Sequence, residues 1–172
     1  MYPNGEDVSA LDELALFAEL GAAFAGFIAI FLIFARREGR FSPADSLRVR
    51  SIILASFSTV FIALLPLILH QAGLSGAELW RTASALALSG GLIAGGVVAR
   101  KHLALAPEDR ADVGRLHSFV TWGLFTIGAI LLAWNALGLG AGGSAWPYLA
   151  SLACSLGVAA TNFVTIAFQR LL

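Results

Sequence analysis

The sequence contains few of the residues that build catalytic, metal-binding or disulfide-bonded sites. Of its 172 residues only one is cysteine, Cys154, which excludes an intrachain disulfide and a metal site built on a cysteine pair. Eleven basic residues balance eleven acidic ones, so the net charge does not favour a nucleic-acid partner. The chain also lacks an HExxH motif, a phosphate-cradling glycine loop and a nucleophile motif. We therefore expect no enzymatic activity, no metal and no cofactor.

Apolar residues are what the chain has in abundance. They make up 58% of the sequence, and the mean hydropathy is +0.82. A helix needs about 20 residues to cross the hydrocarbon core of a bilayer. Five apolar runs approach this length, at residues 14–35, 51–69, 82–98, 119–137 and 148–168. The sequence thus predicts an all-α, polytopic integral membrane protein, with residues 1–172 forming a single domain of five transmembrane helices in contact with membrane lipid.

The basic residues predict the orientation of this domain. Ten of the eleven fall in the connector 36–50, in the connector 100–115 or at Arg170. Because cationic connectors are retained in the cytoplasm, the N-terminus should lie outside and the C-terminus inside. Arginine outnumbers lysine ten to one, which we interpret as a bacterial source with GC-rich coding. We predict a multi-pass protein of the cell inner (plasma) membrane.

Aromatic residues collect at the predicted outer boundary of the membrane, as amphipathic rings do. We expect Trp80, Trp134, Trp146 and Tyr148 to lie in this boundary layer, and Asn135, beside Trp134, to be interfacial as well.

Both predicted inner connectors contain a helix start. Residues 42–45 (Ser-Pro-Ala-Asp) combine an N-cap candidate, a proline at the first helical position and an acid in the first turn. Residues 106–109 (Ala-Pro-Glu-Asp) repeat this pattern at an offset of 64, so helices two and four should begin well before their spans. Two interpretations remain open: a parallel repeat of spans one and two in spans three and four, with span five added, or convergence on the same connector chemistry.

Small residues mark two of the spans as packing surfaces. Gly21 and Ala25 lie four residues apart on the first span, and Gly91 and Gly95 form a GxxxG on the third. Small side chains let helices approach closely in lipid. We interpret these four positions as helix-packing residues within one chain or between chains; the alternative is a glycine-lined permeation path.

Three polar residues within the spans are the candidate functional positions. Glu19 should lie roughly 6 Å below the outer edge of the hydrocarbon, and Arg81 at a similar depth. We expect the two to form an ion pair, with a protonatable or cation-binding role for Glu19, or exposure to headgroups, as the alternatives. Asn162 should either hydrogen-bond to another helix or line a polar cavity.

The histidines do not indicate a metal site. His102 and His117 lie near Asp112, but their spacing matches no ligand signature. A pH sensor at the inner surface is the remaining interpretation of these histidines.

Two classes of function are compatible with these features. The first is a small homo-oligomeric, channel-like or transport-related protein, with any polar path formed between helices or subunits. Because five spans in 172 residues leave little room for a cavity inside one protomer, we expect the path between subunits. The alternative is a non-transporting structural or accessory subunit of a larger membrane complex, for which sparse ionisable residues in the spans are ordinary.

Overall fold

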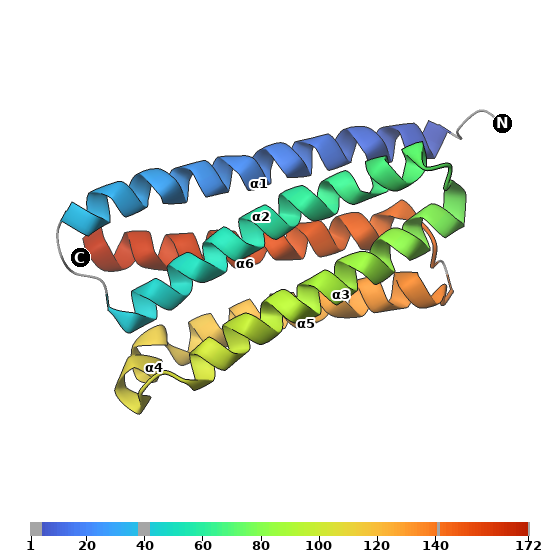
Figure 1. Ribbon diagram of the computed structural model, residues 1–172. Helices are drawn as coiled ribbons and strands as arrows, with labels where there is room; N and C mark the ends of the chain where they lie inside the picture. Colours follow the sequence, from blue (N-terminus) through green and yellow to red (C-terminus); the bar gives the residue numbers. More distant parts are fainter. Residues whose placement is uncertain (1–4, 38–41, 141, 172) are drawn as a thin grey trace.

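The computed structural model describes residues 5–37, 42–140 and 142–171, which form helices joined by short turns. Figure 1 shows the six helices: α1 (Gly5–Arg37), α2 (Pro43–Gln71), α3 (Gly76–Leu103), α4 (Pro107–Val113), α5 (Arg115–Leu137) and α6 (Ala145–Leu171). Five of them, all except α4, are long and apolar enough to cross a membrane. The prediction of an all-helical, multi-pass membrane protein is confirmed at this level.

Four of the long helices form a ring. Helix α2 packs on α6, α6 on α5, α5 on α3 and α3 on α2. Helices on opposite sides of the ring make few contacts; α3 and α6, for example, barely touch. Helix α1 lies outside this helix ring, against α2 and α6, and runs along the top of Figure 1.

The two predicted helix starts differ in outcome. Helix α2 begins at Pro43 as expected, and the Ser42 hydroxyl caps it by accepting a hydrogen bond of 3.1 Å from the Asp45 backbone N–H. Helix α4 begins at Pro107, but it ends at Val113 and does not continue into the membrane. Gly114 has φ +82°, a left-handed conformation that breaks the helix before α5. The prediction of one continuous helix from Pro107 is therefore wrong.

Two of the predicted boundary aromatics are core residues instead. Trp80 and Tyr148 are 2% and 0% exposed, and their rings lie 5.8 Å apart between centroids. They fill the space between the helices at the end of the ring where α3 and α6 begin, together with Leu14 and Leu152. Trp146, by contrast, is 48% exposed, and Trp134 packs edge-on against it. The sequence could not distinguish the buried rings from the more exposed ones, because all four residues lie near the same end of the helices.

Asn135 is fully buried rather than interfacial. Its amide nitrogen donates to Ser84 Oγ at 2.9 Å and to the Ser144 carbonyl at 3.0 Å. Its amide oxygen accepts from the backbone N–H groups of Gly143 (2.6 Å) and Ser144 (3.2 Å). One side chain thus ties the α5–α6 connector to α3.

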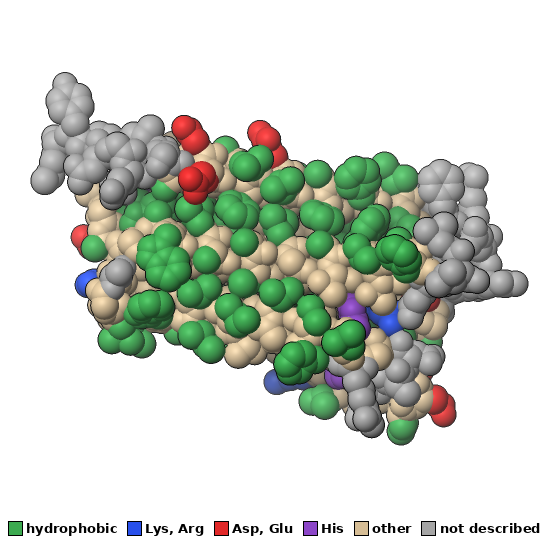
Figure 2. Space-filling view, turned by 180° about the vertical axis from the view of Figure 1, so that it is seen from behind, with side chains coloured by type: hydrophobic (Ala, Val, Ile, Leu, Met, Phe, Trp, Pro, Cys, Tyr) green, Lys and Arg blue, Asp and Glu red, His purple; other side chains and the backbone are tan. Residues whose placement is uncertain are grey.

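The outside of the helix bundle is apolar over most of its length (Figure 2). Large side chains such as Phe27, Phe61, Ile93 and Phe119 are more than half exposed. Such a surface is unfavourable in water and suits contact with lipid. Charged side chains in the same view lie mainly toward the two ends.

Candidate functional site

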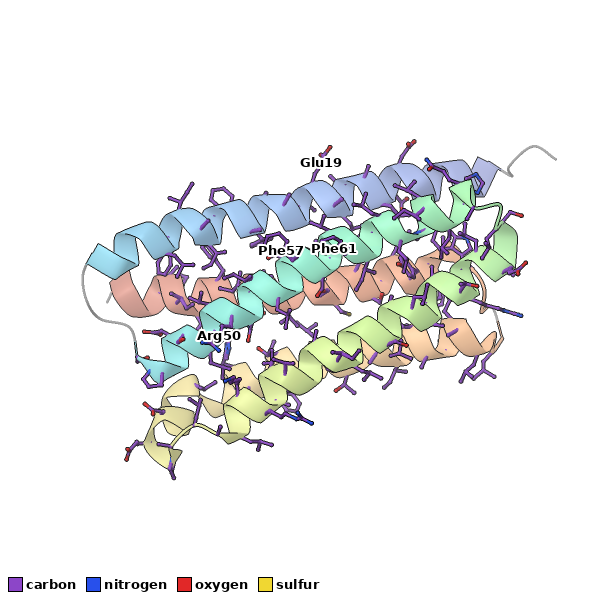
Figure 3. The ribbon with its side chains drawn as sticks, viewed as in Figure 1. Glu19, Arg50, Phe57 and Phe61 are labelled. Atoms are coloured by element: carbon purple, nitrogen blue, oxygen red, sulfur yellow. The ribbon has the colours of Figure 1, made fainter. Side chains whose placement is uncertain are left out.

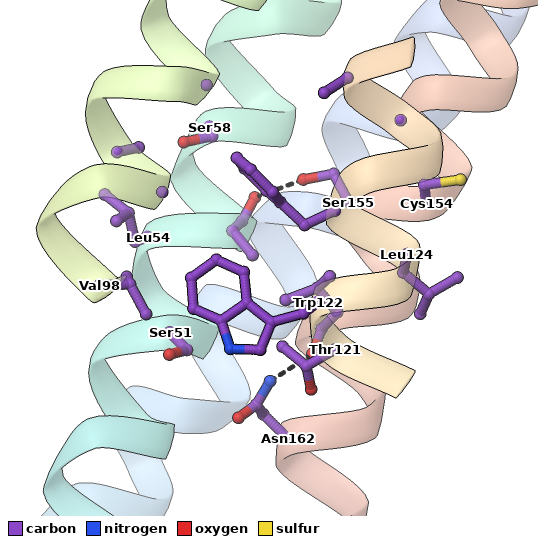
Figure 4. Close-up of a pocket in the computed structure, with 18 of the residues that line it drawn as sticks. Ser51, Leu54, Ser58, Val98, Thr121, Trp122, Leu124, Cys154, Ser155 and Asn162 are labelled. Carbon is purple, nitrogen blue, oxygen red and sulfur yellow. Dashed lines mark hydrogen bonds between the residues drawn. The ribbon is translucent and has the colours of Figure 1, made fainter. Parts of the chain in front are cut away.

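A cavity of about 140 Å³ lies inside the helix ring. Residues of α2, α3, α5 and α6 line it, and Figure 4 shows Trp122 of α5 reaching across it. Most of the lining is apolar, with several hydroxyl groups and one thiol. These polar groups belong to Ser51, Ser58, Ser118, Thr121, Ser151, Ser155 and Cys154.

The position of this cavity corrects one expectation. We expected too little room for a polar cavity inside one protomer, because five spans are formed from only 172 residues. The ring arrangement separates α2 from α5 and α3 from α6, so space remains in its centre. Gly91 contributes to that space: it lines the cavity, and a Cβ added to it would meet no atom within 4 Å.

The end of the cavity next to α4, called here the α4 end, is basic. Arg48, His102 and His117 line it, and the residues that line the cavity include no carboxylate. Arg48 is 2% exposed. Its Nη1 lies 3.2 Å from Asp45 Oδ1, and its Nη2 donates to the Val113 carbonyl at 3.3 Å. Arg48 therefore connects α2 to the junction between α4 and α5.

His117 links α5 to α6 beside this basic end. Its Nε2 lies 3.2 Å from Asn162 Oδ1, and its Nδ1 lies 3.0 Å from Thr165 Oγ1. Since the Asn162 amide nitrogen donates to the Val158 carbonyl at 2.8 Å, the Asn162 oxygen is the acceptor for the His117 N–H. Asn162 is buried and lines the cavity while it bridges the two helices, so it takes both positions considered for it.

Thr121 presents the clearest unmet hydrogen-bonding group in the cavity. Its Oγ1 is buried and has no hydrogen-bond partner among the described residues. Nearby, Ser155 is engaged, because it accepts from Thr59 at 3.1 Å and donates weakly to the Ala55 carbonyl. A buried hydroxyl without a partner is costly, so we expect a water molecule or a solute group to complete the bonding of Thr121.

The structure does not bring Glu19 and Arg81 together. Glu19 lies on the side of α1 that faces away from the other helices (Figure 3), and Arg81 is exposed on α3. Helix α2 lies between α1 and α3. The Arg81 side chain instead leans on the α5–α6 connector, where a Cβ at Gly143 would lie 3.2 Å from Arg81 Nε. The expected ion pair within the chain is wrong.

The predicted packing residues have different surroundings. A Cβ at Gly21 would lie 2.9 Å from the Ser56 carbonyl oxygen, so Gly21 permits close packing of α1 on α2. Gly95 lies directly against the Phe125 ring and permits the packing of α3 on α5. Ala25 is half-buried on α1. Both glycine contacts lie within one chain, so neither glycine is free to join subunits.

The histidines and acids form no metal site in the part of the chain described. No group of three His, Cys, Asp or Glu side chains converges among the described residues. His102 and His117 both line the cavity. The Asp112 side chain, which we considered with them, lies outside the described residues.

A spacing signal for this cavity is present in the sequence, and we did not recognise it. Ser51 and Ser58 are seven residues apart on α2, as are Ser155 and Asn162 on α6. Seven residues make about two helical turns, so each pair lies on one face. His117 and Thr121 share a face of α5 at a spacing of four. Three helices with a polar face in an apolar chain indicate a common polar interior.

Comparison with known proteins gives no relative: no family model matches the chain, and no curated protein or solved structure is detectably similar to it. Any function must therefore be inferred from the cavity and its lining.

Proposed function

We propose that this chain is a membrane transport protein whose pathway is the cavity inside the helix ring of each protomer. The observation that carries the proposal is the cavity of about 140 Å³ itself, whose lining combines apolar side chains with polar ones such as Arg48, Thr121 and Asn162. About 10 to 15 Å³ suffices for one water molecule, and the cavity is roughly tenfold larger. Apolar pockets with a few polar groups are typical of small-molecule sites.

Side chains lie at both ends of the proposed pathway and would have to move during transport. At the α4 end, the Arg48 guanidinium is bonded to the Val113 carbonyl across the mouth. At the opposite end, Leu132 and Leu152 belong both to the cavity lining and to the buried core around Trp80. Bonded or packed side chains at both ends favour a gated carrier or channel over a permanently open pore.

The lining favours a small amphipathic anion as the solute. The lining contains the Arg48 guanidinium and the imidazoles of His102 and His117, and none of the described lining residues is acidic; Asp45, which pairs with Arg48, is not itself in the lining. The rest of the lining is apolar and offers contact to an aromatic or aliphatic body. An engineered cavity of about 150 Å³ in another protein binds benzene, so a single-ring anion is of suitable size.

A matched pair of glycines tests this proposal. Gly91 lines the cavity and Gly90, its neighbour on α3, is exposed; a Cβ at either would meet nothing within 4 Å. Gly91→Leu adds a side chain at a position that lines the cavity, and Gly90→Leu adds the same side chain outside. We expect liposomes with wild-type or Gly90→Leu protein to take up benzenesulfonate, and Gly91→Leu to reduce uptake to that of protein-free liposomes.

The permanent cation phenyltrimethylammonium, with the same ring, tests the sign of the solute charge. We expect its uptake to stay at the protein-free level for all three proteins, because the lining is basic. Equal benzenesulfonate uptake with Gly91→Leu and Gly90→Leu would refute the pathway through the cavity. Faster uptake of the cation than of the anion would refute the anion preference alone.

The proposal includes the predicted setting of the protein. The N-terminus lies outside, the C-terminus inside, and the protein is a homo-oligomer in a bacterial inner membrane. The basic connectors support this orientation. The parallel repeat stays a prediction; in the structure its two connectors differ, because Pro43 begins a long helix and Pro107 a short one.

A second candidate function is an accessory subunit of a larger membrane complex. The observation that favours it is Glu19, an ionisable side chain that points away from all of the protein's own helices. A charged group in that position is typical of a contact with another membrane protein.

A further inference from the structure

Glu19 is an exposed carboxyl group well inside a transmembrane helix. It lies seven residues from the start of the apolar segment Asp12–Leu32, whose first two residues are acidic, which agrees with the depth of roughly 6 Å expected from the sequence. Figure 3 shows it near the middle of α1, on the side away from α2 and α6. No basic side chain among the described residues pairs with it. A carboxylate in contact with lipid at this depth is unfavourable, so a group outside the protomer is expected to meet it.

The surface around Glu19 is flat because its neighbours are small. Ala15, Ala22, Ala23 and Gly26 lie at positions −4, +3, +4 and +7 from it and share its helix face. All four are exposed, and a Cβ on Gly26 would meet nothing within 4 Å. Leu16 and Phe27 border this surface with larger exposed side chains, whereas Asp12 and Ile30, at positions −7 and +11, lie on it toward its two ends. The backbone of another helix can therefore approach α1 closely at Glu19.

We propose that two copies of this chain associate in the membrane through this face, with α1 against α1 and the two Glu19 carboxyl groups hydrogen-bonded to each other. In a two-fold interface the residue on the axis meets its own copy, so carboxyl meets carboxyl. A protonated carboxyl group carries no charge and both donates and accepts a hydrogen bond. The pair thus satisfies two polar groups that lipid would leave unmet, at the point where small neighbours allow the closest approach.

A second copy inserted in the same orientation fits this face best. Both copies obey the same basic-connector rule, so their α1 helices run in the same direction and like positions face each other. Association through α1 leaves the helix ring of each copy intact, because α1 lies outside the ring. The interface is therefore independent of transport through the cavity.

Cysteine cross-linking in native membranes tests the interface. In a Cys154→Ser background, Ala15→Cys and Ala23→Cys each place a thiol on the Glu19 face, and Ile93→Cys places one on the exposed side of α3. Under mild oxidation we expect disulfide-linked dimers from Ala15→Cys and from Ala23→Cys, and no more than background dimer from Ile93→Cys. Equal yields at all three positions would overturn the proposal.

Two other outcomes would also overturn it. Cross-links that form only between an Ala15→Cys copy and an Ala23→Cys copy would show that the helices run in opposite directions. A cross-link from Ala23→Cys to a different protein would show that the face holds an accessory partner instead of a second copy.

Substitution of Glu19 tests the role of the carboxyl group. Glu19→Gln keeps a group that can both donate and accept, whereas Glu19→Ala removes it but keeps the surface small. We expect Glu19→Gln to dimerise in nanodiscs like the wild type, and Glu19→Ala to associate about tenfold more weakly. Wild-type association by Glu19→Ala would refute the carboxyl pair.

Two measurements keep this test separate from folding and from transport. The thermal stability of the monomer should be unchanged in Glu19→Ala, since Glu19 faces away from the other helices. Benzenesulfonate uptake per protomer should also persist in Glu19→Ala, because the cavity lies within one chain. Loss of dimer with retained uptake supports both proposals, and retained dimer with retained uptake overturns the carboxyl pair and leaves the transport proposal standing.

Discussion

The Tyr148 hydroxyl donates a hydrogen bond of 2.6 Å to the backbone carbonyl of Ile62, four residues before Pro66. In a regular helix this carbonyl accepts from the N–H of the residue four positions later, which proline lacks. Tyr148 is fully buried and comes from α6. Its hydroxyl therefore replaces a bond that Pro66 removes from α2, and α2 runs through the proline as one helix from Pro43 to Gln71.

This relationship predicts that Tyr148→Phe lowers the free energy of unfolding by about 1 to 2 kcal/mol, because the Ile62 carbonyl loses its partner. The measurement is denaturation in mixed detergent. In a Pro66→Ala background the backbone regains an N–H that can bond to the Ile62 carbonyl, so the same Tyr148→Phe change should cost clearly less there. Equal costs in the two backgrounds would show that Tyr148 does not compensate for Pro66.

Asn135 should be among the most sensitive polar residues. Asn135→Ala removes the hydrogen bonds that hold the α5–α6 connector, including the 2.6 Å bond in which the Asn135 amide oxygen accepts from the Gly143 backbone N–H. We expect a loss of at least about 2 kcal/mol in unfolding free energy and faster proteolysis in the connector. Thr126→Ala is the control, because Thr126 is exposed and bonds only to its own helix at Trp122. An equally small effect of both substitutions would contradict the role of Asn135.

Gly95 should matter for the fold of the single chain. Gly95→Leu places a side chain against the Phe125 ring, which we expect to cost about 1 to 3 kcal/mol in unfolding free energy. Phe125→Ala should recover part of this loss by making room. Gly96→Leu, on the next residue, should be nearly neutral because its Cβ meets nothing within 4 Å. If Gly95→Leu leaves the free energy of unfolding unchanged but separates subunits, then Gly95 contributes to subunit association and not to the packing of α3 on α5.

The orientation can be tested with two exposed positions. Ala72 lies between α2 and α3, and Glu108 lies in α4 at the other end of the molecule. In a Cys154→Ser background, an impermeant maleimide should label Ala72→Cys in intact cells. Glu108→Cys should be labelled only after permeabilisation, because the basic connectors predict that α4 lies inside. The reverse pattern would invert the topology.

Much of the fold could be predicted because membrane helices depend on local sequence. Every backbone polar group in lipid must be satisfied within the segment, so apolar length alone specifies a spanning helix. The start of α2 also depends on neighbours within three residues, and Ser42 caps it as predicted. The end of α4 was missed because Gly114 can continue a helix or break it, and the surrounding packing decides which.

The sequence by itself therefore determined the class of the protein: five apolar helices of membrane length, with basic residues concentrated in two of the connectors. Only the tertiary structure decided which faces of those helices meet. Asn162 turned toward His117 and the cavity, whereas Glu19 turned away from every other helix. In lipid an apolar face can contact either protein or hydrocarbon at similar cost, so hydrophobicity does not specify the inward side. Shape complementarity between distant segments, such as Gly95 with Phe125, specifies it instead.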